Sequence, residues 1–180
     1  MSQLKVNSIV PVGGLPSGSS GGIIQIRQTV KTDVSSAQVG SNTLSGSVGL
    51  DVNITPSSAS SKILILVSAS VSGSHSGETQ GIVLLRGGSV ITGASGDADG
   101  SRGLASSMAY LINSGGSVQT ISMQYLDSPA STSQQTYSIQ LKYFAGASSH
   151  TIYINRLKSD DNAYYRTRSA SFVTAMEVTA

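Results

Sequence analysis

Apolar residues in this chain recur at every second position, in short segments separated by small, turn-forming residues. In one such segment, Tyr137, Ile139, Leu141 and Tyr143 alternate with polar residues. A period of two places the apolar side chains on one face of a β-strand. The same alternation occupies residues 23–27, 50–54, 63–71, 121–125 and 152–154, and the apolar segment 172–178 closes the chain. No segment of ten or more residues has a convincing helical period, so the sequence predicts an all-β chain.

Two local patterns refine this prediction. Residues 63–67 are apolar on both faces, which is typical of a central strand. Residues 82–85 and 90–91 flank Arg86-Gly87-Gly88-Ser89, and glycines that can adopt positive φ favour a hairpin there. Residues 103–112 are ambiguous, and we interpret them as a strand. Short strands at regular spacing favour two packed sheets, so we predict a jelly-roll-like antiparallel β-sandwich of about eight or nine strands.

The first 22 residues differ from the rest. Residues 11–22 contain two prolines and a Gly/Ser run, which favour neither a helix nor a central strand. The segment before and within this run carries the aliphatic residues Leu4, Val6, Ile9, Val10 and Leu15. We predict an extended N-terminal arm and Gly/Ser linker over residues 1–22 and a β-sandwich head over residues 23–180. An ordinary disordered terminus is the alternative.

Composition excludes several classes of protein. The chain has 180 residues, 38 % of them apolar and 11 % charged, which suits one folded domain. The formal net charge is +2 and the basic residues are scattered, so nucleic acid is not an expected partner. No window approaches the roughly 20 apolar residues of a membrane-spanning helix, and residues 1–10 lack a secretory signal. We therefore expect synthesis in the cytoplasm and no membrane partner.

The pattern of titratable residues does not favour catalysis or metal binding. His75 lies in a Gly/Ser-rich turn, and His150 follows another Ser-rich turn at the start of a strand. Neither has an acidic partner placed by a recognisable motif. Asp97-Ala98-Asp99-Gly100-Ser101 resembles the start of a calcium loop, but its glycine comes too early and Met108 occupies the twelfth position. We interpret it, and Asp160-Asp161-Asn162, as turns. The sequence predicts no catalytic residue, no metal site and no cofactor.

One aromatic cluster could contact a ligand. Tyr164, Tyr165 and Arg166 are adjacent, and Arg168 follows. A single patch is weak support for base stacking, which needs aromatic residues among several basic ones. We regard the three residues as a candidate exposed recognition patch, for example for a host surface glycan or another receptor. Tyrosines that cap a sandwich edge are the alternative interpretation.

Several ordered segments resemble the β-sandwich heads of bacteriophage tail fibres, tailspike tips and capsid decoration (cement) proteins. The segments are Leu4–Ile9, Leu85–Gly88 with Gly96–Arg102, Tyr125–Pro129 with Thr136-Tyr137, and Ile152–Arg156 with Ala175–Val178. The resemblance implies a non-enzymatic virion structural protein that forms a homotrimer without a cofactor. It also implies a place on the outer surface of the virion, which the protein would reach after synthesis in the host cytoplasm.

The resemblance leaves two roles open. Tail fibres combine such a head with a tail-binding domain and a trimeric shaft, and the chain has no heptad repeat that would form a shaft. We therefore expect a trimeric decoration protein that stabilises the outer capsid surface, with its arm residues in contact with the major capsid protein. A receptor-binding tip for host recognition is the alternative.

Overall fold

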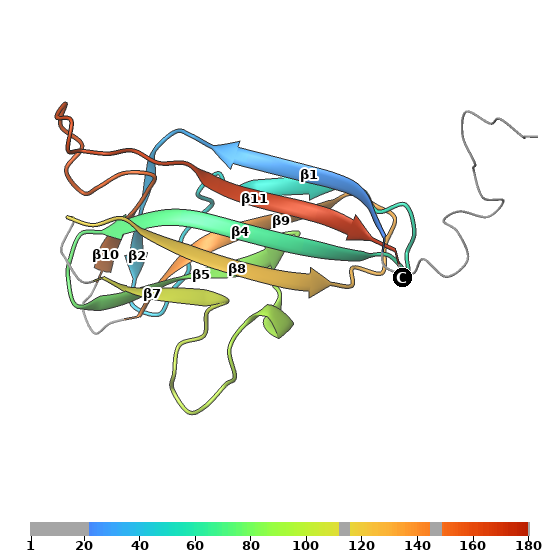
Figure 1. Ribbon diagram of the computed structural model, residues 1–180. Helices are drawn as coiled ribbons and strands as arrows, with labels where there is room; N and C mark the ends of the chain where they lie inside the picture. The colour runs from blue at the N-terminus through green and yellow to red at the C-terminus, as the bar shows by residue number, and fades with distance from the viewer. Residues whose placement is uncertain (1–21, 112–115, 145–148, 180) are drawn as a thin grey trace, which may run out of the picture.

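Two antiparallel β-sheets pack face to face in the computed structural model, which describes residues 22–111, 116–144 and 149–179 (Figure 1). The strands are β1 (Ile23–Lys31), β2 (Ser35–Gly40), β3 (Asp51–Ile54), β4 (Lys62–Gly73), β5 (Glu78–Arg86), β6 (Ser89–Val90), β7 (Ser107–Leu111), β8 (Gln119–Asp127), β9 (Gln135–Phe144), β10 (Ser149–Ile154) and β11 (Ser171–Val178). The helical part of the described residues is one 3₁₀ turn, Thr92–Ala94, and no described helix is long and apolar enough to cross a membrane. The predicted all-β sandwich is confirmed, with more strands than expected.

The order of the strands identifies the topology as a jelly roll. In the first sheet, β11 lies between β1 and β4, and β8 pairs with the other edge of β4. In the second sheet, β9 lies between β3 and β5, and β7 pairs with the other edge of β5. These eight strands, taken in chain order, form the sheets 1-8-3-6 and 2-7-4-5, which is the two-Greek-key arrangement of a jelly roll.

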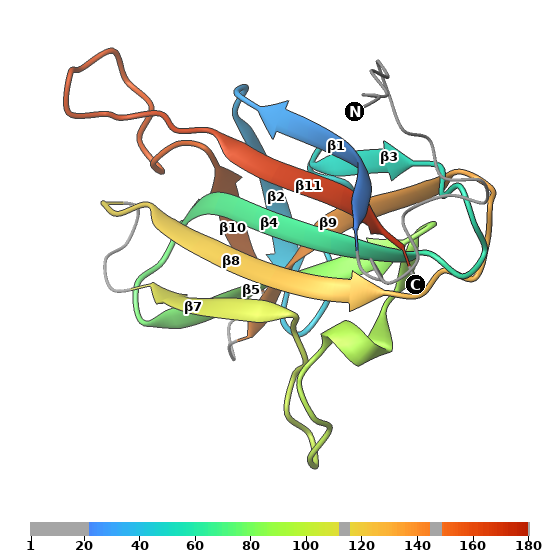
Figure 2. The same cartoon turned by 45° about the vertical axis from the view of Figure 1, so that its right-hand side comes forward.

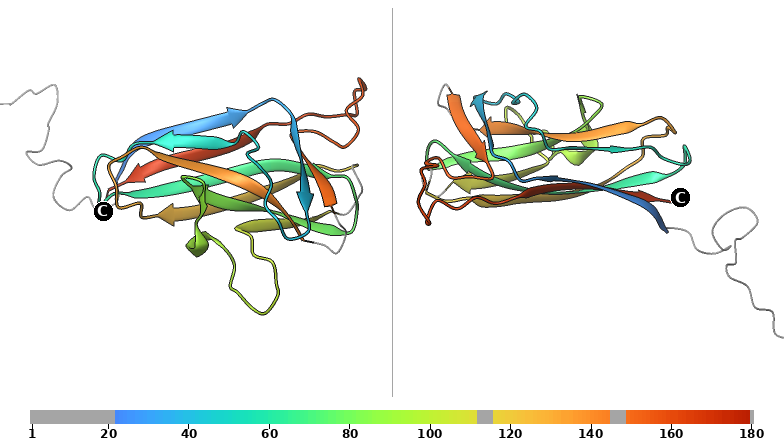
Figure 3. Two further views of the ribbon diagram at one scale, coloured as in Figure 1. Left: turned by 180° about the vertical axis from the view of Figure 1, so that it is seen from behind. Right: turned by 90° about the horizontal axis from the view of Figure 1, so that it is seen from above.

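The three remaining strands elaborate this frame. The two-residue strand β6 forms a hairpin with β5. β10 pairs with the end of β4 and with β2. β2 and β10 run across one end of the sandwich, and Ser41, just after β2, bridges to Tyr143 on β9 of the second sheet (Figure 3). They therefore close that end of the space between the sheets.

The predicted alternation sets the inner faces of both sheets. Ile63, Ile65, Val67, Ala69 and Val71 of β4 are buried, as expected for one face of a strand. The alternating residues of β9 meet them from the second sheet, and the two sets belong to one hydrophobic cluster. The prediction of a central position for residues 63–67 is confirmed, since β11 and β8 flank them on either side.

Part of the outer face of the second sheet is covered by the chain itself. Val83 and Leu85 point away from the main core and form a second small cluster with Ala105, against which Phe144 packs. Ala105 belongs to the long loop that leaves β6 and projects before it returns to β7 (Figure 2). This loop shields Val83 and Leu85 from solvent, whereas Met108 and Tyr110 on β7 of the same sheet stay exposed. The first sheet has no such cover among the described residues.

Local expectations had mixed outcomes. The hairpin at Arg86–Ser89 is confirmed, with φ of 55° at Gly87 and 81° at Gly88. Residues 103–112 contain a strand only from Ser107 to Leu111 in the described part of the chain. Residues 35–40 form β2 although the segment contains few apolar residues. Its conformation is fixed by pairing with β10, a contact that the local sequence does not encode.

Candidate functional site

The outer face of the first sheet carries many apolar side chains, with a few uncharged polar ones among them. Val30 on β1 is the cross-strand neighbour of Phe172 on β11. One row of paired residues crosses the whole sheet, from Ile26 on β1 through Met176 on β11 and Leu64 on β4 to Leu126 on β8. We call the following residues the apolar face: Ile26, Val30, Leu64, Leu66, Leu126, Phe172, Met176 and Val178. Four of them are exposed, with 55 % for Ile26 and 45 % for Leu126, and the other four are partly exposed.

A groove of about 540 Å³ lies in the middle of the apolar face. Leu66 and Phe172 contribute its apolar walls, and Ser68, Ser122 and Thr174 contribute small polar groups. Among the outward positions of the described strands β1, β11, β4 and β8, Lys62 at the start of β4 is the one charged residue. Apolar area without charge is typical of a surface that is buried by assembly.

The predicted recognition patch lies on a projecting loop. Residues 155–170 extend from the sandwich at the end opposite to the C-terminus (Figure 1). Tyr164 is 97 % exposed, its ring meets that of Tyr165 edge to face, and the Arg166 guanidinium lies 5.1 Å from the Tyr165 ring centre. The structure therefore brings the three residues together on the surface.

Ion pairs hold the base of this loop. Arg166 Nε donates to Asp161 at 3.0 Å, and Arg168 Nη2 donates to Asp160 at 2.7 Å. The hydrogen bond from Arg168 lowers the pKa of Asp160 from its ordinary value. Because arginines occupy both carboxylates, this geometry favours the turn interpretation of Asp160-Asp161-Asn162 over a calcium site.

The five aliphatic residues of the predicted arm lie outside the described residues. The described chain starts at Gly22, which is hydrogen-bonded to Thr179, just after β11. The Thr179 N–H donates to the Gly22 carbonyl at 3.0 Å, and the Gly22 N–H donates to the Thr179 hydroxyl at 3.1 Å. The described chain therefore enters the sandwich beside its C-terminus. The capsid contacts of Leu4, Val6, Ile9, Val10 and Leu15 remain a prediction.

A third group of residues has no recognisable signature in the sequence. His75, in the turn between β4 and β5, lies with its Nδ1 3.2 Å from Nδ1 of His150 on β10. The carboxylate of Glu78, at the start of β5, is 3.1 Å from His150 Nδ1 and 3.9 Å from His75 Nδ1. Each histidine therefore has an acidic neighbour, contrary to the interpretation from local motifs. The spacing of His75 and Glu78 alone was too common a pattern to reveal the cluster.

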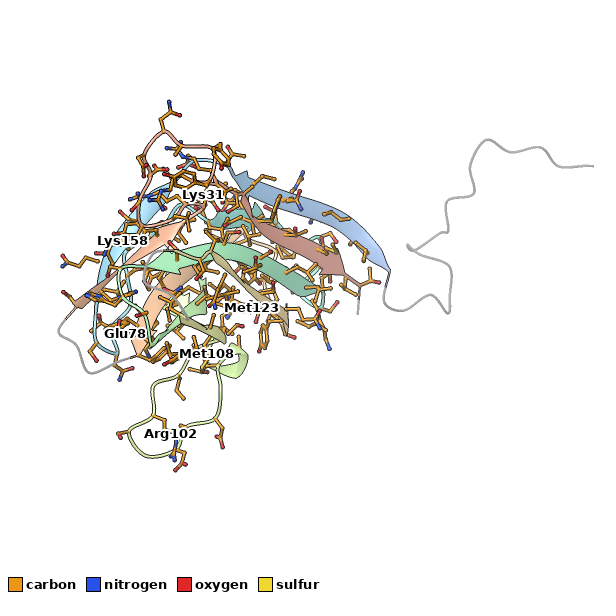
Figure 4. The ribbon with its side chains drawn as sticks, turned by 60° about the vertical axis from the view of Figure 1, so that its left-hand side comes forward. Lys31, Glu78, Arg102, Met108, Met123 and Lys158 are labelled. Atoms are coloured by element: carbon orange, nitrogen blue, oxygen red, sulfur yellow. The ribbon has the colours of Figure 1, made fainter. Side chains whose placement is uncertain are left out.

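This cluster lies at the turn between β4 and β5, and Glu78 at the start of β5 is labelled in Figure 4. Tyr143 stacks on His150, with ring centres 4.8 Å apart. Burial, together with the neighbouring Glu78 carboxylate, raises the pKa of Tyr143 to about 12. Burial also lowers the pKa of His150, although the Glu78 charge opposes this effect.

Comparisons with known proteins do not identify a family. No family model matches the sequence, and no curated protein matches it. Among solved structures, the chain is similar to a chain of infectious bursal disease virus, Gx strain, with 11 % sequence identity and a TM-score of 0.38. The match covers 94 % of this chain and 44 % of the viral chain, so the chain spans less than half of that protein's length. The jelly-roll assignment rests on the strand order alone.

Proposed function

We propose that this protein is a non-enzymatic structural component of a bacteriophage virion, and specifically a homotrimeric decoration protein on the outer surface of the capsid. The apolar face is the observation that carries the proposal. A jelly roll is a frequent scaffold of viral shell proteins, so the topology is compatible with this role. Fold alone does not imply function, and the argument therefore depends on the surface.

The apolar face suits contact with other copies of the same chain. Its exposed side chains, including Phe172 and Ile26, lie on regular strands, so their positions are fixed before assembly. Interfaces between identical subunits are richer in apolar area than other protein surfaces. The outer face of the second sheet differs in the described residues, because Val83 and Leu85 lie under the loop between β6 and β7, and the row across the sheet that contains the exposed Met108 also contains Lys142. Two neighbouring copies are the occupants that we assign to this face.

Attachment to the shell is assigned to the arm. The described chain begins beside the C-terminus, at the end of the sandwich opposite to the loop 155–170 (Figure 1). If residues 1–21 contact the major capsid protein, the loop with Tyr164 would point away from the shell. This orientation leaves the apolar face free for contacts between subunits.

Assembly can be tested with two surface variants. Phe172→Glu places a charge on the apolar face, and Val90→Glu places one on β6 of the other sheet, where the native side chain has the same 39 % exposure. We expect a trimer for the wild-type protein and for Val90→Glu at micromolar concentration, and a monomer for Phe172→Glu. Burying a charge without a partner should outweigh the contacts that the rest of the face makes. Multi-angle light scattering gives the mass, and circular dichroism checks that each variant is folded.

A wild-type monomer would contradict the trimer, and dissociation of Val90→Glu instead of Phe172→Glu would place the interface on the other sheet.

The loop 155–170 supports a second candidate function, receptor binding at a tail tip. Tyr164 is 97 % exposed on this loop, and the neighbouring Tyr165 carries Arg166 against its ring. Aromatic rings and arginine are frequent in binding surfaces. The copy number in purified particles separates the two roles. Hundreds of copies per particle, with immunogold label on the shell, would support decoration, and a handful of copies at the tail would support receptor binding.

A further inference from the structure

We propose that His75, Glu78 and His150 form a binding site for a divalent transition-metal ion, with zinc as the best-matched candidate. The two imidazole Nδ1 atoms and one Glu78 carboxylate oxygen would be the protein ligands. The inference does not depend on a virion role.

The three ligand atoms have the spacing of a metal site. They are separated by 3.1, 3.2 and 3.9 Å. A point equidistant from atoms with this spacing would lie about 2.0 Å from each, which equals the length of zinc–nitrogen and zinc–oxygen bonds, about 2.0–2.2 Å. Two imidazoles and one carboxylate favour zinc or another first-row transition metal over magnesium or calcium, which prefer oxygen ligands.

Several buried polar atoms near the three ligands have no hydrogen-bond partner of good geometry in the described part of the chain. Glu78 Oε2 and the Tyr143 hydroxyl are buried and have no hydrogen-bond partner of good geometry among the described residues. The same is true of both amide atoms of Gln80, which is 1 % exposed and is the cross-strand neighbour of Tyr143 on β9. Buried polar atoms ordinarily have partners, since leaving one unpaired costs about 1–3 kcal/mol. An ion with its bound waters would supply partners at this position.

The backbone keeps His150 in place. A Cβ atom at Gly73 would lie 2.3 Å from His150 Nε2 and 2.3 Å from Leu111 Cδ1, so only glycine leaves room for the imidazole. Tyr143 covers the other side of the ring by stacking. His75, by contrast, sits in the turn, and its side chain is 58 % exposed. The site therefore combines a fixed ligand with one that an ion would draw in from the surface.

Binding would join two parts of the chain that are distant in sequence. His75 lies in the β4–β5 turn and Glu78 follows it at the start of β5, whereas His150 lies 75 residues after His75. Ser74 already links the turn to β10, because the Thr151 N–H donates to the Ser74 hydroxyl at 3.1 Å. The ion would lock this turn against β10 and stiffen the far end of the sandwich. It would leave at least one coordination position open to water, since the protein supplies three ligands.

Zinc binding to the purified, tag-free full chain tests the proposal. After treatment with a chelator, isothermal titration calorimetry with zinc chloride should give one ion per chain, and zinc should raise the melting temperature. His75→Ala should weaken zinc binding at least about tenfold, since even residues that only hydrogen-bond to a metal ligand contribute about 10–100-fold to affinity. Ser76→Ala, in the same turn, is the matched control and should bind as the wild type does. His75 is exposed, so its replacement should not prevent folding.

Cobalt provides a second measurement that does not depend on stability. The wild-type protein with cobalt should show visible absorption bands of a nitrogen- and oxygen-ligated ion, and both His75→Ala and Glu78→Gln should lose them. Equal zinc affinity of the wild type and His75→Ala would overturn the proposal and indicate adventitious binding to surface carboxylates. No binding at 100-fold molar excess of zinc would also overturn it.

Discussion

At the scale of single residues, Asp127 connects the two sheets. It is the last residue of β8, is 5 % exposed, and accepts hydrogen bonds from the Tyr137 hydroxyl at 2.7 Å and from Arg86 Nη1 at 2.6 Å. Tyr137 and Arg86 belong to β9 and β5 of the second sheet. One carboxylate therefore satisfies a buried hydroxyl and a half-exposed guanidinium across the sandwich.

We expect Asp127→Ala to lower the free energy of unfolding by about 2–3 kcal/mol, because it leaves the buried Tyr137 hydroxyl unpaired and removes the partner of Arg86. Urea denaturation followed by circular dichroism measures the change. Asp99→Ala removes an exposed ion pair with Arg102 and should change stability by less than about 1 kcal/mol. Equal effects of the two substitutions would show that the cross-sheet contact contributes little.

At the scale of elements, Glu177 joins β11 to β1 and to the loop after β3. Its side chain is buried and accepts hydrogen bonds from Gln25 Nε2 and from both the N–H and the hydroxyl of Ser57, the latter two at 2.7 Å. Burial by itself would raise the pKa of Glu177, but the hydrogen bonds from Gln25 and Ser57 lower it to about 2. The ionised form is therefore the one that the fold stabilises.

This lowered pKa predicts a defined dependence of stability on pH. The contribution of Glu177 should be complete above the ordinary pKa of a glutamate, about 4.3, and should decline as the pH falls toward the folded-state value of about 2. We expect the wild type to be more stable than Glu177→Gln at pH 7, with the difference shrinking between about pH 5 and pH 2. Thermal unfolding at a series of pH values gives the comparison. A difference that stays constant with pH would contradict this account.

At the scale of the whole molecule, the two ends of the sandwich have different roles in the proposed function. One end holds Gly22, where the described chain begins, and the other end holds the loop 155–170 and the His75–Glu78–His150 cluster. The apolar face runs along the side between them. Attachment, assembly and exposure would thus occupy separate surfaces, and each can be altered without disturbing the others.

Deletion of residues 2–20 separates attachment from assembly. The truncated protein should still form trimers with an unchanged melting temperature, because the described pairing begins at Gly22. It should bind capsids that lack this protein far more weakly. Each fully buried aliphatic side chain contributes about 1.5–3 kcal/mol at most, and three arms acting together would multiply the loss. Cosedimentation with such capsids measures the binding.

A full-length variant with Leu4, Val6 and Ile9 replaced by serine controls for the length of the arm and should bind as weakly as the truncated protein. Undiminished binding by both would move the attachment to the head.

The sequence determined the strands whose side chains alternate, because every second residue of a strand lies on its inner face. It therefore predicted the buried faces of β4 and β9, and the hairpin at Gly87-Gly88, where positive φ favours glycine. It did not predict β2, whose few apolar residues leave its conformation to its partner β10. Local periodicity could indicate two sheets, but it carries no information on which strands are neighbours.

Only the tertiary structure decided the strand order, and with it every arrangement between distant segments. β1 pairs with β11, although the two strands lie at opposite ends of the sequence. This pairing helps to create the apolar face from strands whose sequences do not individually indicate an interaction surface. His75 and His150 meet because β10 pairs with the end of β4. Such contacts depend on how two sheets pack, which is a property of the sum of many weak interactions and not of any one segment.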